Sequence, residues 1–204
     1  MSDHVLDLNG FTEIPGGKVA FVVTYLEMLA APDKPLAPAR DDVKLERWHV
    51  PDPGTYRELF REVGEDWIWF GRLTYDDATL SRLLNEPERE NFLPLRDGKP
   101  VGILELDYAH PEEPVVAYFG LVPGAIGGGL GRWLMSQAVE MAWSRPETRR
   151  LWLHTCTADS PQALKFYMSC GFKPYKRAIE VADDPRLLGH HPREKAPHVP
   201  VIDG

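Results

Sequence analysis

The sequence predicts a single α/β domain, and three features lead to this prediction. Stretches rich in β-branched and aromatic residues recur along the chain and favour strands. An Asp97-Gly98 pair separates two of these stretches, as in a tight hairpin. A glycine-rich turn within residues 121–134 joins a further strand to an amphipathic helix. With 204 residues, 43% of them hydrophobic, the chain is long enough to bury a sizeable core.

Strands are expected where β-branched and aromatic residues fill the segments between turn signals. They lie at residues 19–29, 43–50, 91–96, 100–108, 115–122, 151–155 and 172–181. The first follows the turn-prone Pro15-Gly16-Gly17, and we expect it either to add to a sheet edge or to pair with a second subunit in a homodimer. The second ends before Pro51, because proline removes a backbone donor. The third and fourth flank the Asp97-Gly98 turn, and the fifth enters the glycine-rich turn.

Helices are expected where apolar residues recur at intervals of three and four. They lie at residues 56–63, 76–84, 129–144 and 160–170. Thr74 or Asp76 is the expected N-cap of the second helix, and Pro146 prevents the third from continuing. In the fourth helix we expect Ser160 as the N-cap, the following proline at the first helical position and Gly171 as a left-handed C-terminal cap.

Composition limits the classes of function. The formal charge of −8 disfavours a nucleic acid or an anionic membrane as a partner, and it leaves room for cationic or amine substrates. The two cysteines, Cys156 and Cys170, lie in apolar stretches and indicate a reducing compartment. The sequence has no signal-peptide pattern and no apolar run long enough for a membrane helix, so we expect a cytoplasmic protein. No metal is expected, because the spacing of His190, His191 and His198 fits no compact ligand set.

The glycine-rich turn is the main candidate for a binding site. Gly127, Gly128, Gly129 and Gly131 fall within five positions, so the backbone can approach a ligand closely. Leu130, Trp133 and Leu134 begin the helical pattern that follows. The free N–H groups of the helix start therefore lie beside the glycines and predict an anion site, most simply for a phosphate.

Two common phosphate-binding motifs do not fit. A P-loop needs Gly-Lys followed by Ser or Thr, whereas Arg132 and a tryptophan follow Gly131. A dinucleotide site needs an acidic residue about 20 positions after the glycines to hold the ribose. The chain instead offers Arg149, Arg150 and then His154 in that region.

A third interpretation uses the motifs on both sides of the helix. The order Leu121-x-Pro123, Gly127-x-Gly129-x-Gly131, a strand, Ala163-x-x-Phe166-Tyr167 and Gly171-Phe172 resembles the GNAT superfamily of acetyl-CoA-dependent N-acetyltransferases. The resemblance covers residues 101–172 and extends to uncharacterised bacterial members. It implies a mixed, mainly antiparallel twisted sheet with helices on both faces and strands that splay at a cofactor cleft.

The resemblance also implies how acetyl-CoA is bound. Backbone amides from Gly127 to Arg132, with Leu130 among them, would hold the pyrophosphate of coenzyme A. The pantetheine arm would pair with the backbone of Leu121 and Val122, where an N–H near Leu121 would polarise the thioester carbonyl. Two positions depart from the family pattern. Ile126 stands where Arg or Gln is usual, and Ser160 stands where Asn is frequent, so the backbone would carry more of the binding.

The candidate catalytic residues are less strongly indicated. Tyr167 matches the usual general acid of the superfamily beside the coenzyme A sulfur, and the alternative is a core aromatic. Val115 occupies the place of the glutamate base of histone-type members, so that role does not transfer. Glu105 is a candidate to flank the acceptor site, the alternative being a solvated strand face. His154 is a candidate base or a core histidine.

These observations predict one domain over residues 1–204. It comprises an N-terminal extension (1–42), a core (43–181) and a tail (182–204). The expected activity is acetyl transfer from acetyl-CoA to a primary amine of a small molecule or peptide by direct attack in a ternary complex. The alternative is a non-catalytic acyl-CoA sensor or interaction module. The aromatic cluster Trp67, Trp69 and Phe70 is expected either to wall the acceptor pocket or to belong to the core.

Overall fold

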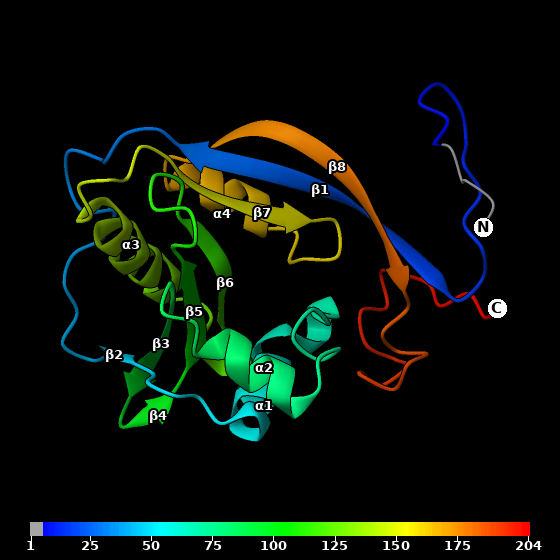
Figure 1. Ribbon diagram of the computed structural model, residues 1–204, viewed down its shortest axis with the longest axis horizontal. Helices are drawn as coiled ribbons and strands as arrows, with labels where there is room; N and C mark the ends of the chain where they lie inside the picture. Colours follow the sequence, from blue (N-terminus) through cyan, green and yellow to red (C-terminus); the bar gives the residue numbers. More distant parts are fainter. Residues whose placement is uncertain (1–5) are drawn as a thin grey trace.

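The computed structural model describes residues 6–204, and it is organised around one sheet (Figure 1). Along the sheet the strands follow the order β2-β3-β5-β6-β7-β1-β8, and β4 pairs with β3. The strands are β1 (Lys18–Met28), β2 (Lys44–Arg47), β3 (Arg89–Arg96), β4 (Lys99–Pro100), β5 (Gly102–Asp107), β6 (Val115–Leu121), β7 (Leu151–Cys156) and β8 (Lys173–Asp183). All pairings are antiparallel except that of β6 with β7, so the predicted mixed, mainly antiparallel sheet is confirmed.

In the described part of the chain, four α-helices and two short 3₁₀ turns accompany the sheet. They are α1 (Pro53–Gly64), η1 (Glu65–Trp67), α2 (Asp77–Leu84), η2 (Pro123–Ala125), α3 (Leu130–Trp143) and α4 (Ala163–Ser169). The side chain of Asp52 caps α1 by accepting from the Thr55 amide, and Asp76 caps α2 in the same way through Thr79. Of the two predicted caps for α2, Asp76 is therefore the one used.

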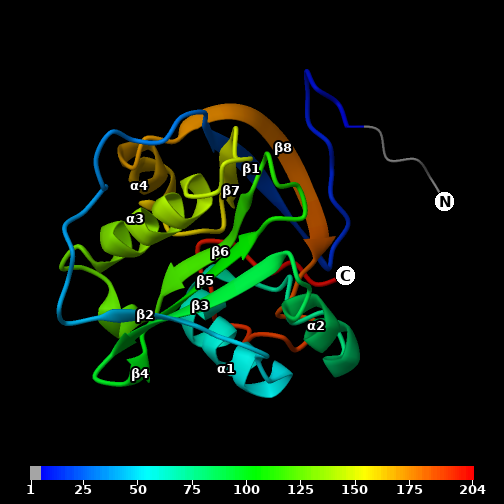
Figure 2. The same ribbon diagram turned by 60° about the vertical axis from the view of Figure 1, so that its left-hand side comes forward.

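The helices cover both faces of the sheet. Strands β6, β7 and β8 run in the same direction, and α3 and α4 connect them in turn. Right-handed crossovers place both of these helices on one face. Helix α1 contacts β5 and β6 from the other face, beside α2. Figure 2 shows this division, with α3 and α4 on one side of the central strands and α1 and α2 on the other.

Strands β6 and β7 diverge after a single paired position. Val115 faces Trp152, and no further pairing joins these two strands in the described part of the chain. The edges of both strands beyond that point are therefore open to a ligand. The predicted splay of two strands ahead of the glycine-rich turn is confirmed.

Three expectations about individual elements need correction. The strand expected at an edge, β1, lies inside the sheet between β7 and β8, so its pairing is satisfied within the chain. Helix α4 starts at Ala163, because residues 160–162 form a tighter turn in which the Ala163 amide donates to the Ser160 carbonyl. Ser160 is therefore not the N-cap. The expected strand 43–50 shortens to β2, and Val50 takes a positive φ of 49°.

The tail after β8 packs against the loop that follows α1. Arg186 is buried, pairs with Asp184 and donates to backbone carbonyls of residues 195, 196 and 199. The His191 Nε2 atom donates to the Trp69 carbonyl over 2.7 Å. The tail thus stabilises the loop from residue 65 to 71. None of the described helices is long and apolar enough to cross a membrane.

Candidate active site

The glycine-rich turn forms an open cradle at the start of α3. Gly127, Gly128 and Gly129 have φ values of 106°, 55° and 78°, a region that side chains with a Cβ rarely adopt. Within residues 6–204, the amides of these three glycines, of Gly131 and of Arg132 donate to no backbone carbonyl or side-chain acceptor. Five N–H groups at the positive end of α3 are therefore available to an anion. The Leu130 amide, which was expected among them, instead donates to the Gly127 carbonyl over 3.2 Å.

Arg40 braces the cradle from the loop before β2. Its Nη1 donates to the Gly128 carbonyl over 2.6 Å, while Nε and Nη2 form two parallel bonds to Asp42. Arg96 also pairs with Asp42 over 3.0 Å. The two guanidinium groups and one carboxylate leave a net positive charge beside the turn. Arg40 could not be predicted from the sequence, because nothing in its local pattern indicates a contact with residue 128.

The backbone of Leu121 points into the gap between β6 and β7. Gly102 and Leu121 face each other in the β5–β6 ladder, and the Val122 amide donates to the Val101 carbonyl over 3.0 Å. This pattern makes Gly102 and Leu121 a non-hydrogen-bonded pair, so the Leu121 N–H points away from β5. Of the two residues expected to pair with pantetheine, Leu121 therefore has a free amide, and the Val122 amide is already used.

A cavity of about 420 Å³ lies in this gap, and we call it the cradle-side cavity. It extends from Ile126 and Gly131 along β6 to the start of α4. Most of its remaining walls are apolar or aromatic, including Val63, Phe119, Leu121 and Phe166. Ser160 also lines it, so this residue reaches the expected cleft although it does not cap α4. Ile126 contributes an exposed apolar side chain there. The space and its free amides fit the pantetheine and pyrophosphate of a coenzyme A thioester.

A second cavity of about 160 Å³ lies beyond it, and we call it the aromatic cavity. Its walls include side chains of the loop 67–71, of β6 and β7, and of Phe21 and Glu180 from β1 and β8. The residues Trp67, Trp69 and Phe70 therefore line a cavity, and Trp69 and Phe70 also pack against the core. Both cavities share five residues, namely Trp67, Trp69, Phe119, Asp159 and Tyr167.

Tyr167 lies at this junction and is held by aromatic neighbours. Its ring makes edge contacts with Phe119 and Phe166, at centroid distances of 6.1 and 5.4 Å. Burial raises the pKa of the Tyr167 hydroxyl well above its ordinary value, and the charge of Asp159 adds to the shift. The phenol is therefore protonated at neutral pH and able to donate a proton. The sequence-predicted general acid lies where the two cavities meet.

Asp159 connects the walls of the junction. Its Oδ1 accepts from the Trp69 indole over 3.0 Å, and its Oδ2 accepts from the Thr155 hydroxyl over 2.6 Å and the Cys156 amide over 2.9 Å. Both oxygens of the Asp159 carboxylate therefore have hydrogen-bond donors. Asp159 could not be predicted from the sequence, because its partner Trp69 lies 90 positions away.

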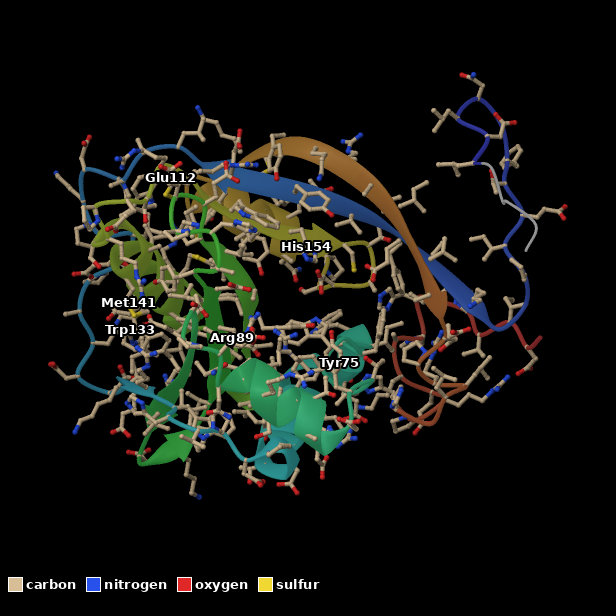
Figure 3. All side chains as sticks on the ribbon, in the orientation of Figure 1. Tyr75, Arg89, Glu112, Trp133, Met141 and His154 are labelled. Atoms are coloured by element: carbon tan, nitrogen blue, oxygen red, sulfur yellow. The ribbon has the colours of Figure 1, made fainter. Side chains whose placement is uncertain are left out.

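His154 lies on β7 and lines the aromatic cavity. Figure 3 shows it on the side of β7 that faces α1 and α2. Desolvation lowers the pKa of His154, and the charges of Asp159 and Glu180 oppose the shift without cancelling it. The imidazole is therefore neutral at pH 7 and available as a proton acceptor. Burial raises the pKa of the nearby Cys156 thiol to about 12, so this thiol is a poor nucleophile.

Glu105 lies in a different environment from the one expected. Its side chain is fully buried, and it accepts from the Tyr56 hydroxyl and from Arg72 Nη2, the latter over 2.7 Å. Arg89 Nη1 is 3.6 Å away. Glu105 does not line either of the two cavities described above. The interpretation as a solvated strand face is wrong, since the carboxylate is part of a buried ion-pair network.

The histidines of the tail point to separate partners. His191 donates to the Trp69 carbonyl, and the His198 ring nitrogen lies 3.3 Å from the Ala158 carbonyl. Within residues 6–204 no group of three His, Cys, Asp or Glu side chains is arranged to hold a metal ion.

Comparisons with known proteins agree with this geometry. Residues 47–172 match the model of the acetyltransferase (GNAT) family. A comparison with curated protein sequences finds no match.

Several solved structures have a similar fold. A functionally unknown conserved protein from Staphylococcus epidermidis aligns with a TM-score of 0.59 at 17% identity, over 82% of this chain and 64% of that one. A tandem GNAT protein from the clavulanic acid biosynthesis pathway aligns with a TM-score of 0.55 at 19% identity, over 80% of this chain and 53% of that one. An aminoglycoside acetyltransferase from an uncultured soil metagenomic sample aligns with a TM-score of 0.52 at 20% identity, over 64% of this chain and 88% of that one. The chain thus spans less than two thirds of the first two structures. At these identities the likeness shows the fold alone.

Proposed function

Because the chain belongs to the acetyltransferase (GNAT) family, we propose that it transfers an acetyl group from acetyl-CoA to a primary amine of a small molecule. Peptide amines fall within the same proposal. The observation that carries it is the junction at Tyr167, where the cradle-side cavity meets the aromatic cavity. A thioester in the first cavity and an amine in the second would meet beside a proton donor.

The cradle supports the cofactor part of the proposal. The amides of residues 127–129, 131 and 132 would hold the pyrophosphate, and Arg40 would keep the Gly128 carbonyl turned away from it. The Leu121 N–H would donate to the thioester carbonyl, where negative charge develops during attack. The departure at Ile126 is compatible with this arrangement, because the donors belong to the backbone.

The chemistry requires one proton to leave the amine and one to reach the sulfur. The amine nitrogen attacks the carbonyl carbon of the bound thioester, an amide forms, and the C–S bond breaks to release coenzyme A. Tyr167, kept protonated by burial, would donate its proton to the departing sulfur. His154, kept neutral by desolvation, would take the proton from the amine directly or through water. Because Glu105 already accepts bonds from two side chains, it is a weaker proposal for the base.

An aminoglycoside acetyltransferase among the structural neighbours supports a small-molecule acceptor, although only through the shared fold. The aromatic cavity provides the second reason, since its volume of about 160 Å³ suits a compact amine.

Thiol release from acetyl-CoA in the presence of a panel of amines tests the proposal. We expect turnover with at least one primary amine, and a decrease in kcat of about 100-fold in Tyr167→Phe, the scale of one general acid. Tyr175→Phe is the matched control, because it removes the hydroxyl of an exposed tyrosine that lines neither cavity. Coenzyme A binding with no turnover for any amine would instead favour the acyl-CoA sensor. Unchanged kcat in Tyr167→Phe, under conditions where chemistry limits the rate, would contradict the general-acid role.

A further inference from the structure

We propose that the acceptor is a compact aliphatic diamine, with its reacting amine beside Asp159 and its second ammonium group beside Glu180. This inference rests on the acetyl transfer proposed above and identifies its acceptor. The observation that carries it is the aromatic cavity, whose walls contain two carboxylates at different places and no lysine or arginine.

The other titratable groups of the cavity are uncharged. Burial raises the pKa of Tyr118 and of Cys156 to about 12 each, and it raises that of Tyr167 further. The lowered pKa of His154 keeps its imidazole neutral. Asp159 and Glu180 therefore supply the charge of this cavity, and it is negative. An acceptor that carries a carboxylate of its own, such as an α-amino acid, would be repelled, whereas a cation is attracted.

The two carboxylates occupy different parts of the cavity. Asp159 follows β7 and lies at the junction that leads to the cradle-side cavity. Glu180 lies on β8 and faces Phe21 of β1 in the strand register. It lines the aromatic cavity and not the cradle-side cavity. Because β1 separates β7 from β8, the strand that carries Glu180 is two strand spacings, or about 10 Å, from β7. A spacing of this size between the strands suits the two ends of a short diamine better than one small ammonium ion.

The walls between the carboxylates suit a methylene chain. Trp67, Trp69, Phe70 and Tyr118 line the cavity. Aromatic faces attract an ammonium group and provide apolar contact for the carbons that separate two such groups. Two hydrogen bonds hold Trp69 in place. Its indole N–H donates to Asp159, and its backbone carbonyl accepts from His191. The cavity of about 160 Å³ is also well below the roughly 300–1,000 Å³ of pockets that hold drug-sized ligands, so the acceptor is small.

Matched pairs of acceptors test the inference. Diaminobutane is compared with n-butylamine, and diaminopentane with n-pentylamine, by kcat/KM for thiol release from acetyl-CoA. The same pairs are then measured with Glu180→Gln. Comparing the diamine preference of the two proteins cancels the intrinsic difference in basicity between diamine and monoamine. Asp183→Asn is the matched control, because Asp183 is a carboxylate of the same strand that pairs with Lys18 and does not line the cavity.

We expect the parent protein to prefer each diamine over its monoamine. Glu180→Gln should reduce this preference about threefold to fivefold, the scale of one solvent-accessible ion pair. The reduction should come from a lower kcat/KM for the diamine, with that for the monoamine unchanged. Asp183→Asn should leave it unchanged. A diamine preference that survives Glu180→Gln, or equal kcat/KM values for each pair, overturns the inference and leaves acetyl transfer standing. Absence of thiol release with every amine overturns the acetyl transfer proposal itself.

Discussion

Replacing Glu105 by glutamine separates a structural from a catalytic role for this carboxylate. The variant keeps the size of the side chain and an oxygen that accepts from the Tyr56 hydroxyl. It removes the negative charge that faces Arg72 over 2.7 Å. Because Glu105 has no solvent-exposed area and the Arg72 side chain is only 10% exposed, water does not compensate for the loss.

The expected cost follows from this burial. Breaking a buried ion pair by removing one partner costs about 3–5 kcal/mol, because an unpaired buried charge remains. Arg72 is also 4.7 Å from the centroid of the Tyr118 ring, and Arg89 retains Asp107 as a partner over 2.7 Å. These contacts offset part of the penalty, so we expect a loss of about 3 kcal/mol in the free energy of unfolding.

Urea unfolding measures the loss, and the activity of the folded fraction is measured on the same samples. Glu27→Gln is the matched control, since Glu27 pairs with Arg150 over 2.8 Å with about a fifth of each side chain exposed. We expect that control to lose less than about 1 kcal/mol. A loss below 1 kcal/mol in Glu105→Gln would refute the ion-pair argument. A hundredfold decrease in kcat at unchanged stability would make Glu105 a catalytic group.

Two further predictions concern the cradle and the candidate base. Arg40→Gln should weaken coenzyme A binding several-fold, as measured by calorimetry, because the Gly128 carbonyl loses its hydrogen bond from Arg40. Arg96→Gln keeps that hydrogen bond and should bind coenzyme A almost normally. Comparable affinities for the two variants would remove Arg40 from the site. At saturating amine, kcat should fall on the acid side only below pH 6.5. Desolvation lowers the pKa of His154, and the opposing charges of Asp159 and Glu180 do not cancel this shift, so the neutral base persists into more acidic solution. His154→Gln should lower kcat and remove this limb, and an acid limb that is unchanged in the variant would contradict the assignment.

The cradle could be predicted from sequence because its determinants are local. Three successive positive φ values are tolerated by Gly127, Gly128 and Gly129 whatever surrounds them, and the apolar pattern after them specifies a helix. The Asp97-Gly98 turn is predictable for the same reason, with φ values of 50° and 74°. Helix α4 shows the limit of local rules. A Ser-Pro pair is a common helix start, but the chain makes a tight turn there and begins the helix at Ala163.

The polar groups around the cavities could not be predicted, because each depends on contacts between distant segments. Asp159 receives Trp69 from the loop after α1. Glu105 becomes part of the core only because Tyr56 and Arg72 converge on it from helix and loop. Alternation along β5 correctly indicates that Glu105 and its neighbours face opposite sides, but it does not tell which side another element covers. Sequence patterns therefore located the glycine-rich cradle better than the aromatic cavity.

Distant contacts also contribute to the proposed phosphate site, which has Ile126 in place of a basic residue. A basic side chain at residue 126 would supply a positive charge from within the turn itself. In this chain the charge comes from outside, since Arg40 and Arg96 together pair with one carboxylate, Asp42. The loop before β2 therefore borders the proposed phosphate site, although no motif in it indicates a ligand. It follows that shortening the loop between residues 31 and 39 should weaken coenzyme A binding even though the glycines are untouched. Calorimetry compares the loop deletion, Arg40→Gln and the two changes combined. The losses of binding free energy should not add in the combined variant, because both changes remove the same contact at Gly128.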